Sequence, residues 1–146
     1  MTINPNNIFE LFSSEFENLE GENEKVHIDF TQTPIYWIGM FKKQVLNSIN
    51  FNKKALKFFK EAQHELDLED IKEAGESIVY NRAWDYINNI DLENPTHLEA
   101  IEQYSDEYLD TALKLGINYF EQESIQEYEK CAHLQKILNK TKEFLS

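Results

Sequence analysis

The sequence predicts an all-α fold, with about six helices in an irregular bundle or in stacked α-hairpins. Apolar residues recur at helical spacing along most of the 146 residues, and only four glycines and three prolines interrupt them. Hydrophobic residues make up 41% of the chain, including ten phenylalanines, which is enough to fill a core. No linker or low-complexity stretch divides the chain, so we expect a single helical domain over residues 1–146.

The N-terminal region is expected to form one helix followed by an extended segment. Residues 7–19 carry an apolar helical stripe, and the polar sequence GENE at 21–24 ends it. Residues 25–30, KVHIDF, alternate apolar and polar side chains, which predicts one short strand or an extended arm. The stripe consists of Ile8, Phe12, Phe16 and Leu19.

The second helix is expected to begin after Thr33, because threonine suits an N-cap and Pro34 suits the first helical position. Its inward face carries Ile35, Ile38, Val45, Leu46 and Ile49. The other side of its first two turns is apolar as well, with Tyr36, Trp37, Met40 and Phe41. A helix start that is apolar all round is either buried on every side or a docking patch.

Three more helices are expected before residue 121. Residues 51–66 place Phe51, Ala55, Phe58, Phe59, Ala62 and Leu66 on an inward stripe. Residues 67–90 begin at a cap, Asp67, and their apolar face rotates near Asn81, which predicts a bend or break there. Residues 96–120 start with a capping box, Thr96 with Glu99, and their stripe is Leu98, Ile101, Tyr108, Leu109, Ala112, Gly116, Tyr119 and Phe120.

The last predicted helix starts at a second capping box, Ser124 with Glu127, and continues to residue 138. Small residues at Cys131 and Ala132 would let another helix approach closely. Flanking contact area comes from Tyr128, Leu134 and Leu138. We therefore interpret this stripe as a packing surface, whose partner lies either inside or outside the chain.

The net charge of −13 is distributed unevenly. Residues 42–60 contain six lysines and no acid, whereas residues 61–129 contain nineteen acids and three basic residues. Such a field repels nucleic acid and anionic lipid and favours a partner with a basic surface. One cysteine, no secretion leader and no run of 18 apolar residues predict a cytoplasmic protein that does not span a membrane.

No constellation of residues predicts catalysis, a cofactor or a metal. Glu61 and His64 have the E-x-x-H spacing of di-metal bundles, but those sites need a second such motif and two further glutamates. Cys131 and His133 diverge on a helix, and zinc would need more thiolates. His27 and Asp29 share a face of the predicted strand, but nothing completes a catalytic set. We therefore expect a protein that is not an enzyme and has no cofactor.

Residues 119–138, YFEQESIQEYEKCAHLQKIL, resemble the UVR motif, a helical hairpin of excision-repair proteins and Clp-protease regulators. The segment Tyr128-Glu129-Lys130-Cys131-Ala132-His133-Leu134 is similar to the core of that motif. The resemblance implies association with another copy or a related helix. A second likeness, of Leu115-Gly116-Ile117-Asn118-Tyr119, is to the L-G-x-x-Y of the tetratricopeptide repeat, which implies stacked hairpins.

These observations predict a non-enzymatic, acidic protein-interaction module, either an adaptor or an assembly component. Its partner would be a protein with a basic surface or a second copy of the chain. The residues expected to bind it are Tyr36, Trp37, Met40, Phe41, Tyr128, Cys131 and Leu134. The alternative is an inhibitor, phage-encoded in this hypothesis, whose carboxylates imitate nucleic-acid phosphates in the basic cleft of a nuclease or polymerase.

Overall fold

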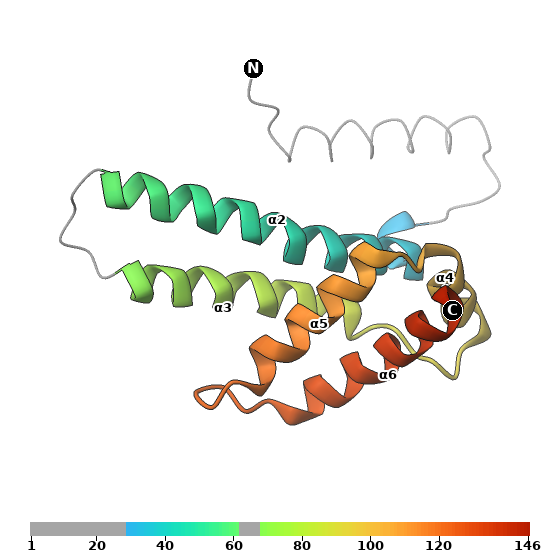
Figure 1. Cartoon of the computed structure of the whole chain (residues 1–146). Helices are drawn as coiled ribbons and strands as arrows, with labels where there is room; N and C mark the ends of the chain where they lie inside the picture. The colour runs from blue at the N-terminus through green and yellow to red at the C-terminus, as the bar shows by residue number, and fades with distance from the viewer. Residues whose placement is uncertain (1–28, 62–67) are drawn as a thin grey trace, which may run out of the picture. The chain divides into compact units, whose positions relative to one another are not determined.

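The structure, a computed structural model, describes residues 29–61 and 68–146. This part of the chain contains five α-helices, one 3₁₀ turn and no strand, which confirms the all-α fold (Figure 1). The elements are η1 (Phe30–Gln32), α2 (Pro34–Glu61), α3 (Leu68–Ile87), α4 (Pro95–Tyr104), α5 (Glu107–Glu121) and α6 (Tyr128–Leu145).

The chain divides into two units at residue 30, and the five helices of the described residues belong to the unit Thr31–Ser146. The helix predicted over 7–19 and most of the strand predicted over 25–30 lie outside the described residues. Phe30 itself begins the 3₁₀ turn. The expected single domain stays a prediction.

Helix α2 is one continuous helix of 28 residues, not the two that its stripes predicted. Its start is confirmed, because the Tyr36 amide donates a hydrogen bond to Thr33 Oγ1 at 3.3 Å. The helix stays continuous because neither Asn50 nor Asn52 is accompanied by a glycine or proline that would end it. Helices α2 and α3 run side by side as an antiparallel hairpin (Figure 1).

Helix α3 is also unbroken, so the break predicted near Asn81 is wrong. The apolar face rotates because the two halves of α3 meet different neighbours. The first half packs on α2, and the second half also packs on α5, where the Tyr80 and Tyr119 rings stack with centroids 4.3 Å apart. Because α2 and α5 contact α3 from different sides, this one continuous helix carries two apolar faces.

The helix predicted over 96–120 is instead two helices, α4 and α5, with a break at Ser105 and Asp106. Asp106 is the N-cap of α5, and its Oδ1 accepts a hydrogen bond from the Leu109 amide at 2.7 Å. The predicted Thr96–Glu99 capping box is also wrong, because the N-cap of α4 is Asn94, whose Oδ1 accepts from the Thr96 amide. Asn94 caps better because Pro95 then occupies the first helical position.

The second predicted capping box is wrong in the same way. Ser124 lies in the turn after α5, and α6 begins only at Tyr128. Glu127 occupies the N-cap position without a side-chain cap bond, while its amide donates back to the Phe120 carbonyl at 2.9 Å. The turn uses Gln126 in the left-handed region, at φ 51°.

The core lies between α2, the second half of α3, α4, α5 and α6. Its largest fully buried side chains are Ile38, Phe41, Val45, Ile87, Ile101, Leu109, Leu113, Phe120, Leu134, Ile137 and Thr141. Gly116 of α5 lies against Leu134 of α6. A Cβ there would stand 3.1 Å from Leu134 Cδ1, which is tight, and 3.6 Å from Phe41 Cζ, which is an ordinary contact, so a larger residue would disturb Leu134.

Candidate interaction surfaces

The apolar start of α2 is largely covered. Phe41 belongs to the core, at 1% exposure, and Met40 is buried as well. Tyr36 and Trp37 are half-buried, and the Trp37 ring meets His97 edge to face with centroids 5.6 Å apart. As a docking site for a partner, this segment offers only the outer edges of Tyr36 and Trp37.

The apolar stripe at the start of α6 has its partner mainly inside the chain. Leu134 is fully buried against α5, and Cys131 is half-buried, with its Sγ donating to the Ile117 carbonyl at 3.6 Å. Burial, assisted by the charge of Glu121, raises the pKa of the Cys131 thiol, which keeps it protonated and a poor nucleophile. Tyr128, at 61%, and Ala132 are exposed, so Ala132 is not covered by another helix as the stripe predicted.

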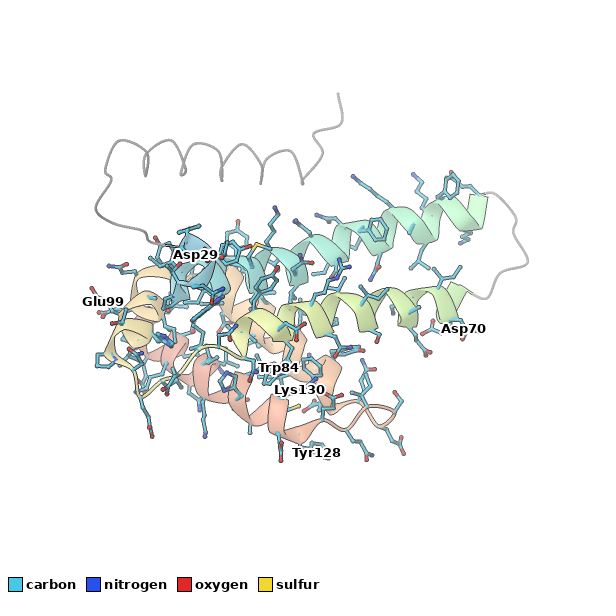
Figure 2. The ribbon with its side chains drawn as sticks, turned by 180° about the vertical axis from the view of Figure 1, so that it is seen from behind. Asp29, Asp70, Trp84, Glu99, Tyr128 and Lys130 are labelled. Atoms are coloured by element: carbon cyan, nitrogen blue, oxygen red, sulfur yellow. The ribbon has the colours of Figure 1, made fainter. Side chains whose placement is uncertain are left out.

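A cluster of aromatic rings surrounds Lys130 where α3, α5 and α6 meet (Figure 2). Lys130 Nζ lies 5.4 Å from the centre of the Trp84 ring and 5.0 Å from that of Phe120. It also lies 2.5 Å from Glu127 Oε2, a buried atom that forms an ion pair but has no hydrogen bond of good geometry. Trp84 in turn meets His133, whose Nε2 is 3.1 Å from the Ile87 carbonyl oxygen.

This cluster joins α3, α5 and α6. Lys130 Nζ is already directed at Glu127, and His133 Nε2 at the Ile87 carbonyl. Lys130 occupies the position that a cationic ligand would take over aromatic faces, so the geometry is that of an internal cation–π contact. We therefore assign the cluster a structural role.

The corner between α4 and α5 is exposed to solvent, unlike the cluster around Lys130. Tyr104 is 42% exposed and Tyr108 is 67% exposed, and Glu102 and Glu107 beside them are exposed too. Neither glutamate forms an ion pair with another described residue. We call these four residues the tyrosine–acid corner. Sequence analysis placed Tyr108 on the buried stripe, which is wrong because the break at residues 105–106 resets the helical phase.

An ion pair ties this corner to α2. Lys42 Nζ lies 2.9 Å from Asp106 Oδ2, and the two residues are 64 positions apart in the chain. Burial alone would raise the pKa of Asp106, but the Leu109 amide and the Lys42 ammonium together lower it below its usual range. Asp106 therefore stays ionised at neutral pH, caps α5 and fixes the corner on the core.

A second exposed surface lies at the far end of the α2–α3 hairpin. Phe51 and Phe58 are 68% and 64% exposed there, so their predicted inward placement is wrong. The side of α2 that faces α3 instead carries Asn52, whose Oδ1 lies 3.6 Å from the Cβ position of Gly75. Phe51 lies about 100° around α2 from Asn52, and so points away from the side that meets α3.

The structure describes only some of the candidate catalytic and metal residues. His27 and His64 lie outside the described residues, while Asp29 and Glu61 are exposed. Across residues 29–61 and 68–146, no group of three or more His, Cys, Asp or Glu side chains could hold a metal ion. The helices of the same ranges include none with the length and apolar character needed to cross a bilayer.

The sequence matches no protein-family model, and comparisons with curated proteins and with solved structures find no match. The resemblances to the UVR motif and to the tetratricopeptide repeat therefore stay predictions. Any function must be argued from the surfaces of this chain.

Proposed function

We propose that the chain is a non-enzymatic protein-interaction module, an adaptor or assembly component, and that its tyrosine–acid corner binds a partner with a basic surface. The observation that carries this proposal is the exposure of Tyr104 and Tyr108 beside two carboxylates without counter-charges. Tyrosine is among the residues that supply most of the energy of protein interfaces. Carboxylates that lack counter-charges attract a basic partner and orient it.

The size and rigidity of the corner support the same role. Its four residues fall within seven positions of the chain, so they fit inside one side of a standard interface, about 800 Å². The Asp106 cap and its ion pair with Lys42 hold the corner in place before a partner arrives. Preorganisation lowers the entropy lost on binding, which favours recognition by a small surface.

The test compares two variants of equal net charge. Glu102→Gln with Glu107→Gln removes two charges from the corner, and Glu121→Gln with Glu123→Gln removes two exposed charges from the other end of α5. Tagged full-length chains would be used for affinity purification from the native cell at low and high salt, with partners quantified by mass spectrometry. Tyr108→Ala tests the aromatic contribution separately.

We expect one or a few basic proteins to be lost with the corner variants and retained by the charge-matched control. High salt should weaken their capture, because exposed charges are screened. Equal capture by all variants would contradict the proposal. Partners that duplex DNA displaces would support the nucleic-acid mimic instead, and loss only with Tyr128→Ala would move the site to the start of α6.

A further inference from the structure

The α2–α3 hairpin has an apolar face on the side away from α5. The two helices meet at Asn52 and Gly75, because Asn52 Oδ1 lies 3.6 Å from the Cβ position of Gly75. Phe51 lies about 100° around α2 from Asn52, and Ile78 lies about 60° around α3 from Gly75 in the same rotational sense. In an antiparallel pair, rotation in the same sense points to the same side of the hairpin. Tyr80, which stacks on α5, lies about 140° from Gly75 in the opposite sense.

This side of the hairpin carries two apolar rows with small residues between them. Phe51 and Phe58, 68% and 64% exposed, form the α2 row, and Ile78, 57% exposed, belongs to the α3 row. Between the rows lie Ala55 and Gly75, which are half-buried and leave room for the side chains of another helix. We call this surface the outer face, and its residues are Phe51, Ala55, Phe58, Ile71, Gly75 and Ile78.

Positive charges border the outer face. Lys54 lies about 60° around α2 from Phe51, and Arg82 lies about 40° around α3 from Ile78. Both are exposed, and neither forms an ion pair with another described residue. Three of the four acids at the start of α3 point about 140° to 180° away from Ile78, and Asp85, on the same line as Ile78, lies two turns further along. The outer face therefore suits an apolar surface with carboxylates at its margins.

The sequence of residues 7–19, which lie outside the described residues, has this complementary pattern. Their predicted helix carries the stripe Ile8, Phe12, Phe16 and Leu19. Around that helix, Glu15 lies about 60° from Phe12 on one side, and Glu20, just after it, about 80° on the other. Residues 1–24 contain six glutamates and no basic residue. We propose that the outer face binds residues 7–19 of the same chain as an amphipathic helix.

The chain between the two parts sets the direction of this helix. Trp37 Nε1 donates to the Thr31 carbonyl at 3.1 Å, which holds the entry of the chain at the start of α2. The ten residue steps from Leu19 to Asp29 span at most about 35 Å. Along α2, Phe51 lies about 26 Å from Pro34, and the end of the helix about 40 Å. Leu19 therefore reaches Phe51 but not the end of α2, so the bound helix runs antiparallel to α2.

The tether also favours this occupant over a second copy or a separate partner. A short flexible connection gives an effective concentration in roughly the millimolar range, whatever the concentration of the protein. The contact does not involve the tyrosine–acid corner, which is built from α4 and α5. Variants of that corner should therefore leave it unchanged.

The test is amide hydrogen exchange of residues 8–19 in the full-length chain. A helix of this length is marginal in water by itself, so slow exchange there reports that the helix is bound. Ile78→Asp changes the outer face, and Phe12→Asp changes the segment. Tyr128→Asp is the matched control, because Tyr128 is a large exposed side chain on α6.

A second set of variants tests the charges at the margins. Lys54→Glu with Arg82→Glu reverses those of the outer face, and adding Glu15→Lys with Glu20→Lys to the same chain restores the opposition of sign. Lys136→Glu with Lys142→Glu, at exposed positions of α6, makes the same change in net charge as the first pair.

We expect residues 8–19 to exchange at least tenfold more slowly in wild type and in both controls than in Ile78→Asp or Phe12→Asp. Reversed charges on the outer face should remove part of this protection, and the fourfold variant should recover it, which excludes misfolding as the cause. Fast exchange in wild type, or protection that survives Ile78→Asp, would overturn the proposal. Protection that rises with protein concentration from about 10 µM to 1 mM would also overturn it, because the helix would then bind a second copy.

Discussion

The packing of α5 on α6 can be tested at Gly116, where the structure allows the size of the effect to be worked out. A Cβ added there would lie 3.1 Å from Leu134 Cδ1, closer than side chains normally approach, and 3.6 Å from Phe41 Cζ, an ordinary contact. Leu134 is fully buried, so it has little room to move aside. The clash therefore depends on one atom of one side chain.

Two effects of Gly116→Ala oppose each other. Alanine in a helix interior is favoured over glycine by about 1 kcal/mol. Inserting a methyl group into a packed core costs about 1 to 3 kcal/mol. The net change should be a loss of about 1 kcal/mol. In a Leu134→Ala background the clashing atom is absent, so Gly116→Ala should stabilise by about 1 kcal/mol. The coupling energy between the two sites should therefore be about 1 to 3 kcal/mol.

Urea denaturation followed by helical circular dichroism would measure the four free energies of unfolding. Leu134→Ala alone should cost about 3 to 5 kcal/mol, and if that leaves too little folded protein, Leu134→Val also lacks the Cδ1 atom. A Gly116→Ala effect of the same sign and size in both backgrounds would refute the close approach of α5 and α6 at this point.

Two further outcomes follow from the α3 contacts. Burial, helped by the charge of Glu76, raises the pKa of Tyr80 to about 12 from 10.0. The stabilisation from neutral Tyr80 is then complete below pH 10 and is lost as the pH rises towards 12. Phenolate absorbance and the free energy of unfolding, measured at each pH, check this expectation. The Tyr80→Phe variant should lack this pH dependence. Lys130→Met should destabilise the fold by about 1 to 3 kcal/mol, because it leaves Glu127 Oε2 buried without its counter-charge. Adding Glu127→Gln should recover part of this loss. An unchanged thermal unfolding temperature in Lys130→Met would contradict the structural role assigned to the cluster.

Sequence patterns predicted the helices better than their junctions. Helical stripes and the Thr33–Pro34 start located α2, and scarce glycine and proline indicated the all-α fold. The break at residues 105–106 was missed because Ile101 and Tyr108, seven residues apart, stay in phase on one helical wheel. Asp106 was the available signal, since aspartate is a favourable N-cap, but its ion pair with Lys42 is visible only in three dimensions.

The missed break also concealed the tyrosine–acid corner. A continuous helix would place Tyr108 about 20° from Ile101, and so beside a buried residue at the edge of the stripe. In the structure α5 starts anew at residue 107, its buried face centres on Gly116, and Tyr108 is left at the edge in solvent. A single helical wheel cannot show this, because it assumes one axis. Surfaces at helix corners therefore escape a periodicity argument even when every helix is located.

The hairpin of α2 and α3 determines where the charges of the sequence lie relative to one another. The lysines of residues 42–60 precede the acids along the chain. Because α3 folds back along α2, positive and negative side chains are carried by neighbouring helices. Lys42 is paired inside the domain with Asp106, whereas Lys53–Lys60 are not paired with any described residue. A basic partner of the proposed kind would therefore be repelled by these lysines and attracted to the corner.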